Sequence, residues 1–249
     1  MTQQYFFCAT SRFALQGGCN FRKYTLILLE VLKCVDDLPR LGIARHILCR
    51  QTKPLSNMEQ KTYKKKYTNA DYYTGGKFNE DVAKKAFLDM FEFYCIPFTP
   101  FLEENFWVND FGLGDFEHVG MGGVFWINNP DYRYFGHEIY LLPGQMIVEH
   151  YHVASDFAAK HESWQVRNGW VYNFGIGEPT PNAPALPESQ KEFITVSNFH
   201  IMKVGDISAL QELESRHFLM AGDEGAVVTE YGTYHDNAGL RFTNPDASL

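Results

Sequence analysis

Short apolar stretches separated by turn-forming residues make up most of the chain after Pro100. Glycine, asparagine and proline lie between them, and the loop-like stretch 177–188 alone holds four prolines. This pattern is typical of all-β sandwiches and barrels. Asn168-Gly169 lies between two of the stretches and predicts a tight hairpin. The candidate strands are 124–127, 137–142, 145–153, 162–166, 170–176, 193–198, 201–204 and 226–234.

One helix is predicted ahead of the strands, over residues 79–95. Asn79 is a suitable N-cap, and acidic residues follow in the first turn. Apolar side chains then recur at helical spacing, from Val82 to Phe93, before Pro97 ends the run. We expect this amphipathic helix to pack on a sheet, so the predicted fold is all-β with a few N-terminal helices.

Composition limits the class of protein. Of the 249 residues, 45% are apolar, which is enough for a sizeable core. A net charge of −8 argues against a nucleic-acid partner. Five cysteines without a CxxC pair do not form a disulfide framework. The longest apolar run, 24–32, is too short to span a bilayer, and no signal peptide opens the chain. We expect a soluble cytoplasmic protein with no membrane partner.

Charge changes sharply along the chain, which indicates a boundary. Residues 1–57 carry eight Lys/Arg against three Asp/Glu and four of the five cysteines, whereas residues 58–249 carry 14 against 27. We therefore treat 1–57 as an N-terminal extension of uncertain status and 58–249 as the functional domain, with Met58 as its natural start. The alternatives are an extra helical layer, since 25–32 has helix formers, or a targeting peptide.

A pair of histidines marks a candidate metal site. Side chains alternate along a strand, so His150 and His152 project from one face. Glu162 would add a carboxylate from the next strand, and imidazole with carboxylate suits Zn, Mn, Fe, Co or Ni. A fourth ligand must come from later in the chain. The candidates are His200, His217 and His235, of which His217 is best placed, before a predicted Gly222/Gly225 turn and a long apolar strand.

The spacing of these residues resembles the first motif of the cupin superfamily. Gly144, His150 and His152 match its first half, and Glu162-x6-Gly169 matches the second. The spacer before Glu162 is nine residues rather than the usual three or four, so Asp156 is a rival third ligand.

Two blocks narrow the resemblance to the D-lyxose isomerases, a cupin branch. The run from Lys160 through Glu162 and Arg167 to Gly169 fits that branch if 154–159 carries a five-residue insertion. A second block runs from His217-Phe218 through Glu230 and Asp236 to Arg241-Phe242, but lacks the proline–glycine turn that usually precedes the late histidine. Together the blocks cover roughly residues 120–245.

The resemblance implies a double-stranded β-helix barrel that isomerises free sugars, such as D-lyxose to D-xylulose or D-mannose to D-fructose. One divalent ion, usually Mn, would be held by His150, His152, Glu162 and His217. Such barrels often pair, so we expect a homodimer.

The remaining site residues are assigned by chemistry. Lys160 lies two residues before Glu162 and should face the same interior, where its pKa could fall enough for proton transfer. Glu230 is the candidate base. The candidates for sugar contacts are Arg167, Asp236, Arg241 and Trp164.

Each assignment has a plainer alternative. Lys160 could be a solvated loop residue, Glu230 could pair with Arg241, and Asp236 could cap a turn. Arg167 could be structural, Trp164 could be core, and we interpret His118 and His137 as structural. For the whole domain, the alternatives are an Fe(II)-dependent cupin dioxygenase and a non-catalytic sugar-binding cupin.

Overall fold

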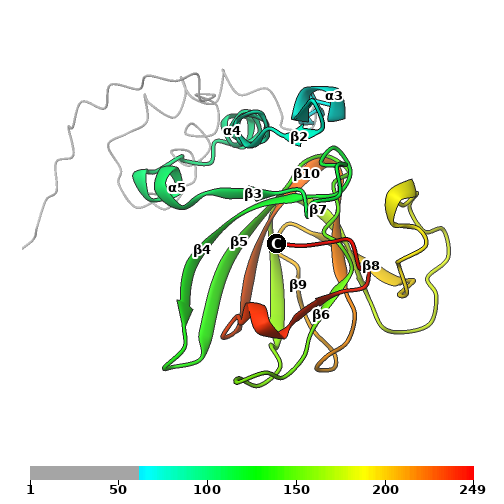
Figure 1. Cartoon of the computed structure of the whole chain (residues 1–249). Helices are drawn as coiled ribbons and strands as arrows, with labels where there is room; N and C mark the ends of the chain where they lie inside the picture. The colour runs from blue at the N-terminus through cyan, green and yellow to red at the C-terminus, as the bar shows by residue number, and fades with distance from the viewer. Residues whose placement is uncertain (1–61) are drawn as a thin grey trace, which may run out of the picture. The chain divides into compact units, whose positions relative to one another are not determined.

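The computed structural model describes residues 62–249, with helices and strands labelled as in Figure 1. The predicted extension 1–57, its 25–32 segment and Met58 lie outside the described residues. The helices are α3 (Asn69–Tyr72), α4 (Glu80–Tyr94), α5 (Pro100–Asn105) and the 3₁₀ turns η2 (Glu188–Gln190) and η3 (Asn237–Gly239). The strands are β1 (Tyr73–Thr74), β2 (Lys77–Phe78), β3 (Trp107–Asn109), β4 (Met121–Asn129), β5 (Tyr134–Leu141), β6 (His150–His152), β7 (Glu162–Gly175), β8 (Asn198–Lys203), β9 (Ile207–Ala209), β10 (Phe218–Thr233) and β11 (Leu240–Phe242).

Antiparallel strands form the body of the described domain, as predicted. The main sheet has the order β3-β4-β5-β10-β7-β8, with β9 also paired to β7. A second pair, β6 with β11, is tied to the main sheet by isolated bridges between Met146 and Met220 and between His150 and His217. The strands curve around a common interior (Figure 1), which confirms the predicted all-β barrel with a few helices ahead of it.

The predicted hairpin at Asn168-Gly169 is wrong. Both residues lie inside the 14-residue strand β7, opposite Val227 and Ala226 of β10. Gly169 has φ +64°, but this left-handed residue serves an irregularity in strand register rather than a chain reversal. The predicted Gly222/Gly225 turn is wrong for the same reason, because β10 runs through it with a register shift between Ala221 and Ala226.

Two other predicted strands are shorter in the structure. Only His150–His152 of the 145–153 stretch is a strand, and the 193–198 stretch enters β8 only at Asn198. The 177–188 stretch is a loop up to η2, as its prolines predict.

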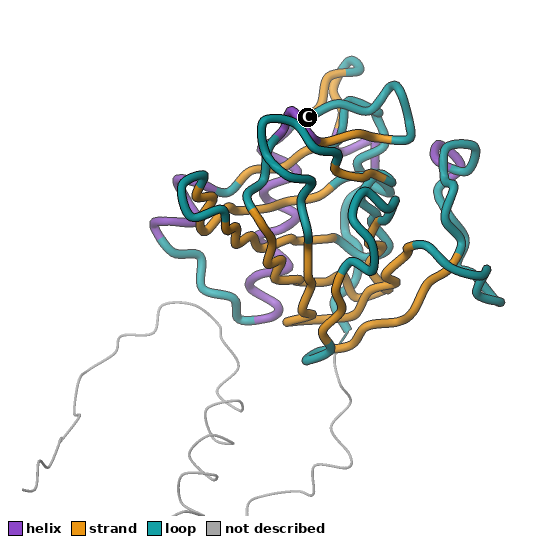
Figure 2. The backbone as a smooth tube through the Cα atoms, turned by 90° about the horizontal axis from the view of Figure 1, so that it is seen from below, coloured by secondary structure: helices purple, strands orange, loops and turns teal. Residues whose placement is uncertain are grey.

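Helix α4 confirms the predicted amphipathic helix. The Asn79 side chain accepts a hydrogen bond from the Val82 amide (3.3 Å), and the helix ends at Cys95 in the left-handed conformation. Its apolar face packs against the outer side of the sheet (Figures 1 and 2). The buried residues of that layer include Ala86, Phe87, Met90, Phe91, Phe106, Phe116, Tyr140 and Val227.

The same strands bury different residues on their two faces because side chains alternate. In β5, Ile139 and Leu141 join the interior core, whereas Tyr140 joins the α4 layer. In β10, Val228 faces inward and Val227 outward. None of the helices within residues 62–249 is long and apolar enough to cross a lipid bilayer.

Candidate active site

Three histidines converge because two chain segments pair at one point. His150 and His217 exchange two backbone hydrogen bonds, N–H to carbonyl, of 3.1 and 3.0 Å. Their ring centres lie 4.4 Å apart, and His152 follows on the same strand as His150. The late histidine predicted from the sequence is therefore fixed beside the His-x-His pair by backbone pairing.

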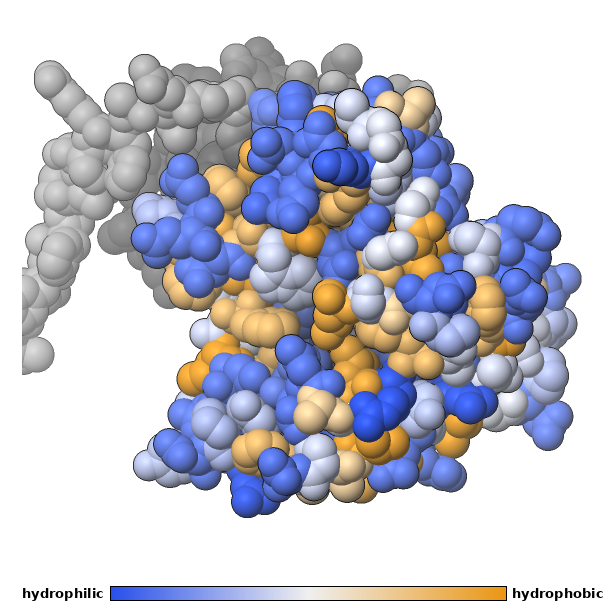
Figure 3. All heavy atoms as spheres, in the orientation of Figure 1, coloured by the Kyte–Doolittle hydropathy of each residue, from blue (hydrophilic) through white to orange (hydrophobic). Residues whose placement is uncertain are grey.

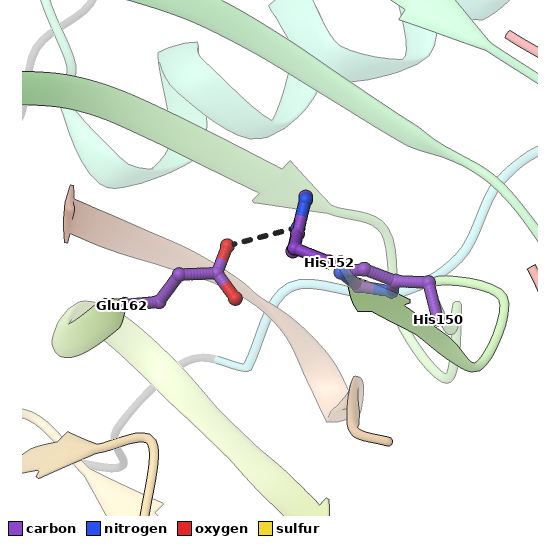
Figure 4. Close-up of side chains that lie close together, drawn as sticks. All are labelled: His150, His152 and Glu162. Carbon is purple, nitrogen blue, oxygen red and sulfur yellow. Dashed lines mark ion pairs between the residues drawn. The ribbon is translucent and has the colours of Figure 1, made fainter. Parts of the chain in front are cut away.

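Glu162 brings the carboxylate, from the first residue of β7. One ligand atom each from His150, His152 and Glu162 lie within 4.8 Å of one another (Figure 4). His217 Nε2 lies 2.9 Å from Glu162 Oε2, and His152 Nε2 lies 3.4 Å from Glu162 Oε1. Asp156, the rival third ligand, is exposed in the loop between β6 and β7. The exposed residues 154–156 of the long spacer thus form a loop on the surface, whereas Ala159 and Lys160 are buried ahead of Glu162.

The donor atoms of this cluster suit a divalent cation. The Nδ1 atoms of His150 and His217 donate to the carbonyl oxygens of Val148 and Ser215, both at 2.9 Å, so Nε2 is the atom that each ring can offer to a metal. Among the described residues, buried His152 Nδ1 has no hydrogen-bond partner, and buried Glu162 Oε2 and His217 Nε2 face each other at 2.9 Å. Buried polar atoms are rarely left unpaired, and a cation would satisfy oxygen and nitrogen lone pairs together.

Charge states at the cluster are set by burial and by its own neighbours. Burial, with His217 and His152 nearby, holds the pKa of His150 well below its usual value, so its ring is neutral. Burial opposes ionisation of Glu162, but Lys160 and His217 outweigh it and hold the pKa of that carboxyl well below its usual range. Neutral imidazole and ionised carboxylate are the forms that ligate metals.

Lys160 lies between two buried carboxylates. Its Nζ is 2.8 Å from Glu162 Oε1, pairs with Glu230 Oε1, and lies 4.1 Å from the centre of the Phe135 ring. Burial lowers its pKa, but the two carboxylates more than offset this, so the pKa of Lys160 is raised. A lowered pKa, which we expect for this lysine beside a bound cation, stays a prediction. Glu230 pairs with Lys160 rather than with Arg241.

Two further histidines reach the site. His137 lies directly opposite Glu230 in the β5–β10 register, and its Nδ1 lies 3.1 Å from Glu230 Oε2. His235 stacks on Phe135, and burial, followed by the charge of Lys160, lowers its pKa to about 4. The sequence predicts a structural role for His137, because no motif spacing supports another one. Its alternation with the inward residues Ile139 and Leu141 along the strand is the signal that could have placed it in the site.

These side chains line a cavity of about 450 Å³ inside the barrel. Figure 3 shows one face of the molecule, on which hydrophobic residues lie in a hollow surrounded by hydrophilic residues. Trp164 is buried in the wall, 5.2 Å from His217 between ring centres. Within the described residues, Lys160 is the one lysine or arginine of the lining. The aromatic lining residues include Trp107, Phe111, Phe125, Phe135, Trp164 and Phe242.

Three predicted sugar-contact residues lie away from this cavity. Arg167 is exposed at the register irregularity of β7. Asp236 caps η3 by accepting from the Ala238 amide (3.0 Å) and from the Ser155 hydroxyl. Arg241 is exposed on β11 and donates to the carbonyls of Ala238 and Leu240. Asp236 and Arg241 thus make local hydrogen bonds near η3, and none of the three residues lines the cavity.

Comparison with known proteins places this chain among sugar isomerases. It is 32% identical over 166 residues to the D-lyxose ketol-isomerase of Thermofilum sp., covering 66% of this chain and 91% of that protein. It is 34% identical over 152 residues to the D-lyxose/D-mannose isomerase of Thermosediminibacter oceani, covering 60% and 82%. No family model matches the chain.

Solved structures agree on the fold. The L-ribose isomerase of Acinetobacter sp. DL28, in complex with L-ribose, superposes with a TM-score of 0.55 at 15% identity, over 75% of this chain and 96% of that one. The L-ribose isomerase of Cellulomonas parahominis with L-psicose gives 0.52 at 16% identity, over 75% and 95%.

Proposed function

This chain belongs to the D-lyxose isomerase family, and from that premise we propose that it interconverts free aldoses and ketoses of the D-lyxose/D-xylulose and D-mannose/D-fructose type. The observation that carries the proposal is the placement of a buried lysine and glutamate beside a histidine–carboxylate cluster in one cavity. Aldose–ketose isomerisation through an enediol requires such a pairing of charge stabilisation with proton transfer.

The cluster is proposed to hold one divalent ion, with Mn²⁺ as the expected metal. His150, His152, Glu162 and His217 would be its ligands, and the ion would supply Lewis-acid stabilisation to the sugar oxygens. In support, the Nδ1 atoms of His150 and His217 are bound to the backbone, so Nε2 is the atom that each ring can offer to the ion.

Glu230 is proposed to move the proton. Burial raises its pKa, but Lys160 and His137 together outweigh burial and lower it, so the carboxyl is ionised. An ionised carboxylate can take the proton from C2 of the sugar and return it to C1. Lys160 keeps its charge and would donate to the oxygen on which negative charge develops. The two side chains touch, so proton transfer and charge stabilisation would occur at adjoining atoms.

The lining of the cavity favours uncharged sugars. A phosphorylated sugar needs cationic or amide donors for its phosphate, and the one lysine of the lining is already paired with two carboxylates. Trp164 offers an aromatic wall on which a sugar ring or chain could stack.

Family membership favours the isomerase over the Fe(II) dioxygenase and the non-catalytic binding protein. A homodimer and a cytoplasmic location stay predictions.

The test is a ketose assay on the purified full chain with D-lyxose, D-mannose, D-ribose and D-glucose, before and after chelation. We expect ketose from D-lyxose or D-mannose, loss of activity with chelator, and recovery with Mn²⁺. Activity on none of the four sugars in the presence of Mn²⁺, Co²⁺ and Zn²⁺ would overturn the proposal.

A further inference from the structure

His137 is a buried residue that the proposed chemistry leaves without a role. It projects from β5 directly opposite Glu230 of β10, and the two side chains share the inner face of the sheet. Its Nδ1 lies 3.1 Å from Glu230 Oε2, while Lys160 occupies Oε1 of the same carboxylate. An ionised carboxylate only accepts hydrogen bonds, so Nδ1 must carry the hydrogen.

The imidazole ring is held from several sides. Trp107 of β3 stacks on it, with ring centres 5.5 Å apart and planes at 23°, and Phe125 of β4 meets it edge-on at 4.9 Å. Gly123 of β4 leaves the space for this stack, because a Cβ there would lie 2.5 Å from both His137 Nε2 and Trp107 Cζ2. Within residues 62–249 the buried Nε2 atom has no hydrogen-bond partner, and the bond of the ring there is to Glu230.

We propose that His137 is a positioning residue for isomerisation: it holds the Glu230 carboxylate in the orientation from which that group exchanges a proton with the sugar. Lys160 contacts a single oxygen of this carboxylate, so a rotation about the Cγ–Cδ bond could exchange the two carboxylate oxygens at its ammonium group. The bond from His137 removes that freedom, so that one face of the carboxylate stays turned to the cavity. This inference rests on the proposed function, with Glu230 as the base.

Asparagine and glutamine at position 137 separate the hydrogen bond from simple packing. The amide nitrogen of asparagine can lie near the position of Nδ1, whereas that of glutamine reaches toward Nε2. We expect H137F to lower kcat about 10- to 100-fold with KM changed less than about twofold, as the loss of a hydrogen bond to a charged group implies. H137N should recover a substantial part of kcat and H137Q should not.

A second pair of variants displaces the ring without changing its chemistry. Gly123→Ala pushes a Cβ against the ring and should lower kcat in the same direction as H137F. Gly136→Ala is the matched control, because it is the neighbouring strand glycine and its Cβ would make an ordinary 3.4 Å contact. It should leave kcat near wild type. Thermal melts of each full-length variant establish that it is folded.

Crystal structures of the wild type and H137N or H137F supply a readout that does not depend on activity. We expect the Glu230 carboxylate to keep its position in wild type and H137N and to rotate in H137F. An unmoved carboxylate in H137F, or equal kcat for H137F, H137N and wild type, overturns the role of His137. A wild type that isomerises no sugar overturns the proposed function instead, and the position of the carboxylate still decides whether His137 holds it.

Discussion

The two faces of the β5–β10 strand pair bury side chains of different kinds and have different roles. The outer face buries aromatic rings under α4, such as Phe87, which is fully buried against Phe106 and Phe116. The inner face of the same strands buries His137 and Glu230, and Lys160 lies against Glu230 there, all of them charged or polar groups. Apolar burial stabilises a fold, whereas burial of charge costs free energy even when the charges are paired. We infer that the outer layer maintains the barrel and the inner layer carries the chemistry.

The strongest way to break this comparison is to neutralise the inner face. Glu230→Gln should lower kcat by about 10²–10⁴-fold, because the proposed base is lost while the shape is kept. The fold should persist, since Lys160 retains Glu162 and the trio of charges becomes a balanced pair. Turnover and urea unfolding of the same preparation measure both. A Glu230→Gln variant that is much less stable than wild type but keeps the wild-type kcat would contradict this account, because the inner face would then stabilise the fold rather than carry the chemistry.

The converse experiment removes an outer aromatic ring. Phe87→Ala should lower the free energy of unfolding by about 3–5 kcal/mol, because a buried ring is replaced by a cavity. At temperatures where the variant stays folded, its KM and kcat should be close to wild type. Phe98→Ala, at a ring 41% exposed, is the matched control and should cost much less. Equal losses for both variants would contradict a stabilising outer layer.

The irregular register between β7 and β10 places one glycine, Gly169, in the left-handed conformation. Gly169→Ala would force φ +64° on alanine and place its Cβ 1.9 Å from the Gly225 carbonyl oxygen. We expect a loss of about 2–3 kcal/mol, measured by urea unfolding. Gly175→Ala in the same strand is the control, because its Cβ would meet nothing within 4 Å. A Gly169→Ala variant as stable as Gly175→Ala would mean that the register irregularity is not needed.

The smallest effect concerns a polar junction outside the cavity. Asp115 accepts hydrogen bonds from Asn69 (2.7 Å), His118 (2.7 Å) and Ser189 (2.8 Å). Burial raises its pKa, but these donors outweigh burial and the pKa is lowered. A lowered carboxyl pKa stabilises the fold above the unfolded value, near 4, and this contribution is lost as pH falls through the folded value.

Asp115→Asn should therefore cost about 1 kcal/mol at pH 7, and the difference from wild type should shrink below about pH 4. Urea unfolding of both proteins between pH 3 and 7 measures it. A difference that stays constant over this range would show that the charge of Asp115 is not what stabilises the junction.

Sequence reasoning found the parts of the site that spacing encodes. His150 and His152 follow from strand alternation, and the resemblance placed Lys160, Glu162, His217 and Glu230, all of which the structure brings to one cavity. His137 carries no motif, because its contact with Glu230 depends on how β5 pairs with β10. Arg167 and Arg241 were expected near the sugar by their position in motifs, but a shift in strand register and an exposed strand direct them outward.

Local turn signals failed where the fold uses them for another purpose. Asn168-Gly169 has the composition of a tight hairpin, and Gly169 does take a left-handed conformation. The β7 residues on both sides of this pair nevertheless stay paired with β10, so pairing between strands overrides the local preference for a turn. Helix 79–95 was predictable because its N-cap, apolar spacing and proline stop agree with one another.

Anomalous X-ray scattering at the manganese edge, from crystals grown with Mn²⁺ and a sugar alcohol, tests the central claim most directly. We predict one peak per chain, at coordination distance from His150, His152, Glu162 and His217, with the polyol between it and Glu230. A peak at other residues, or none at this cluster while the polyol lies elsewhere, would contradict the account.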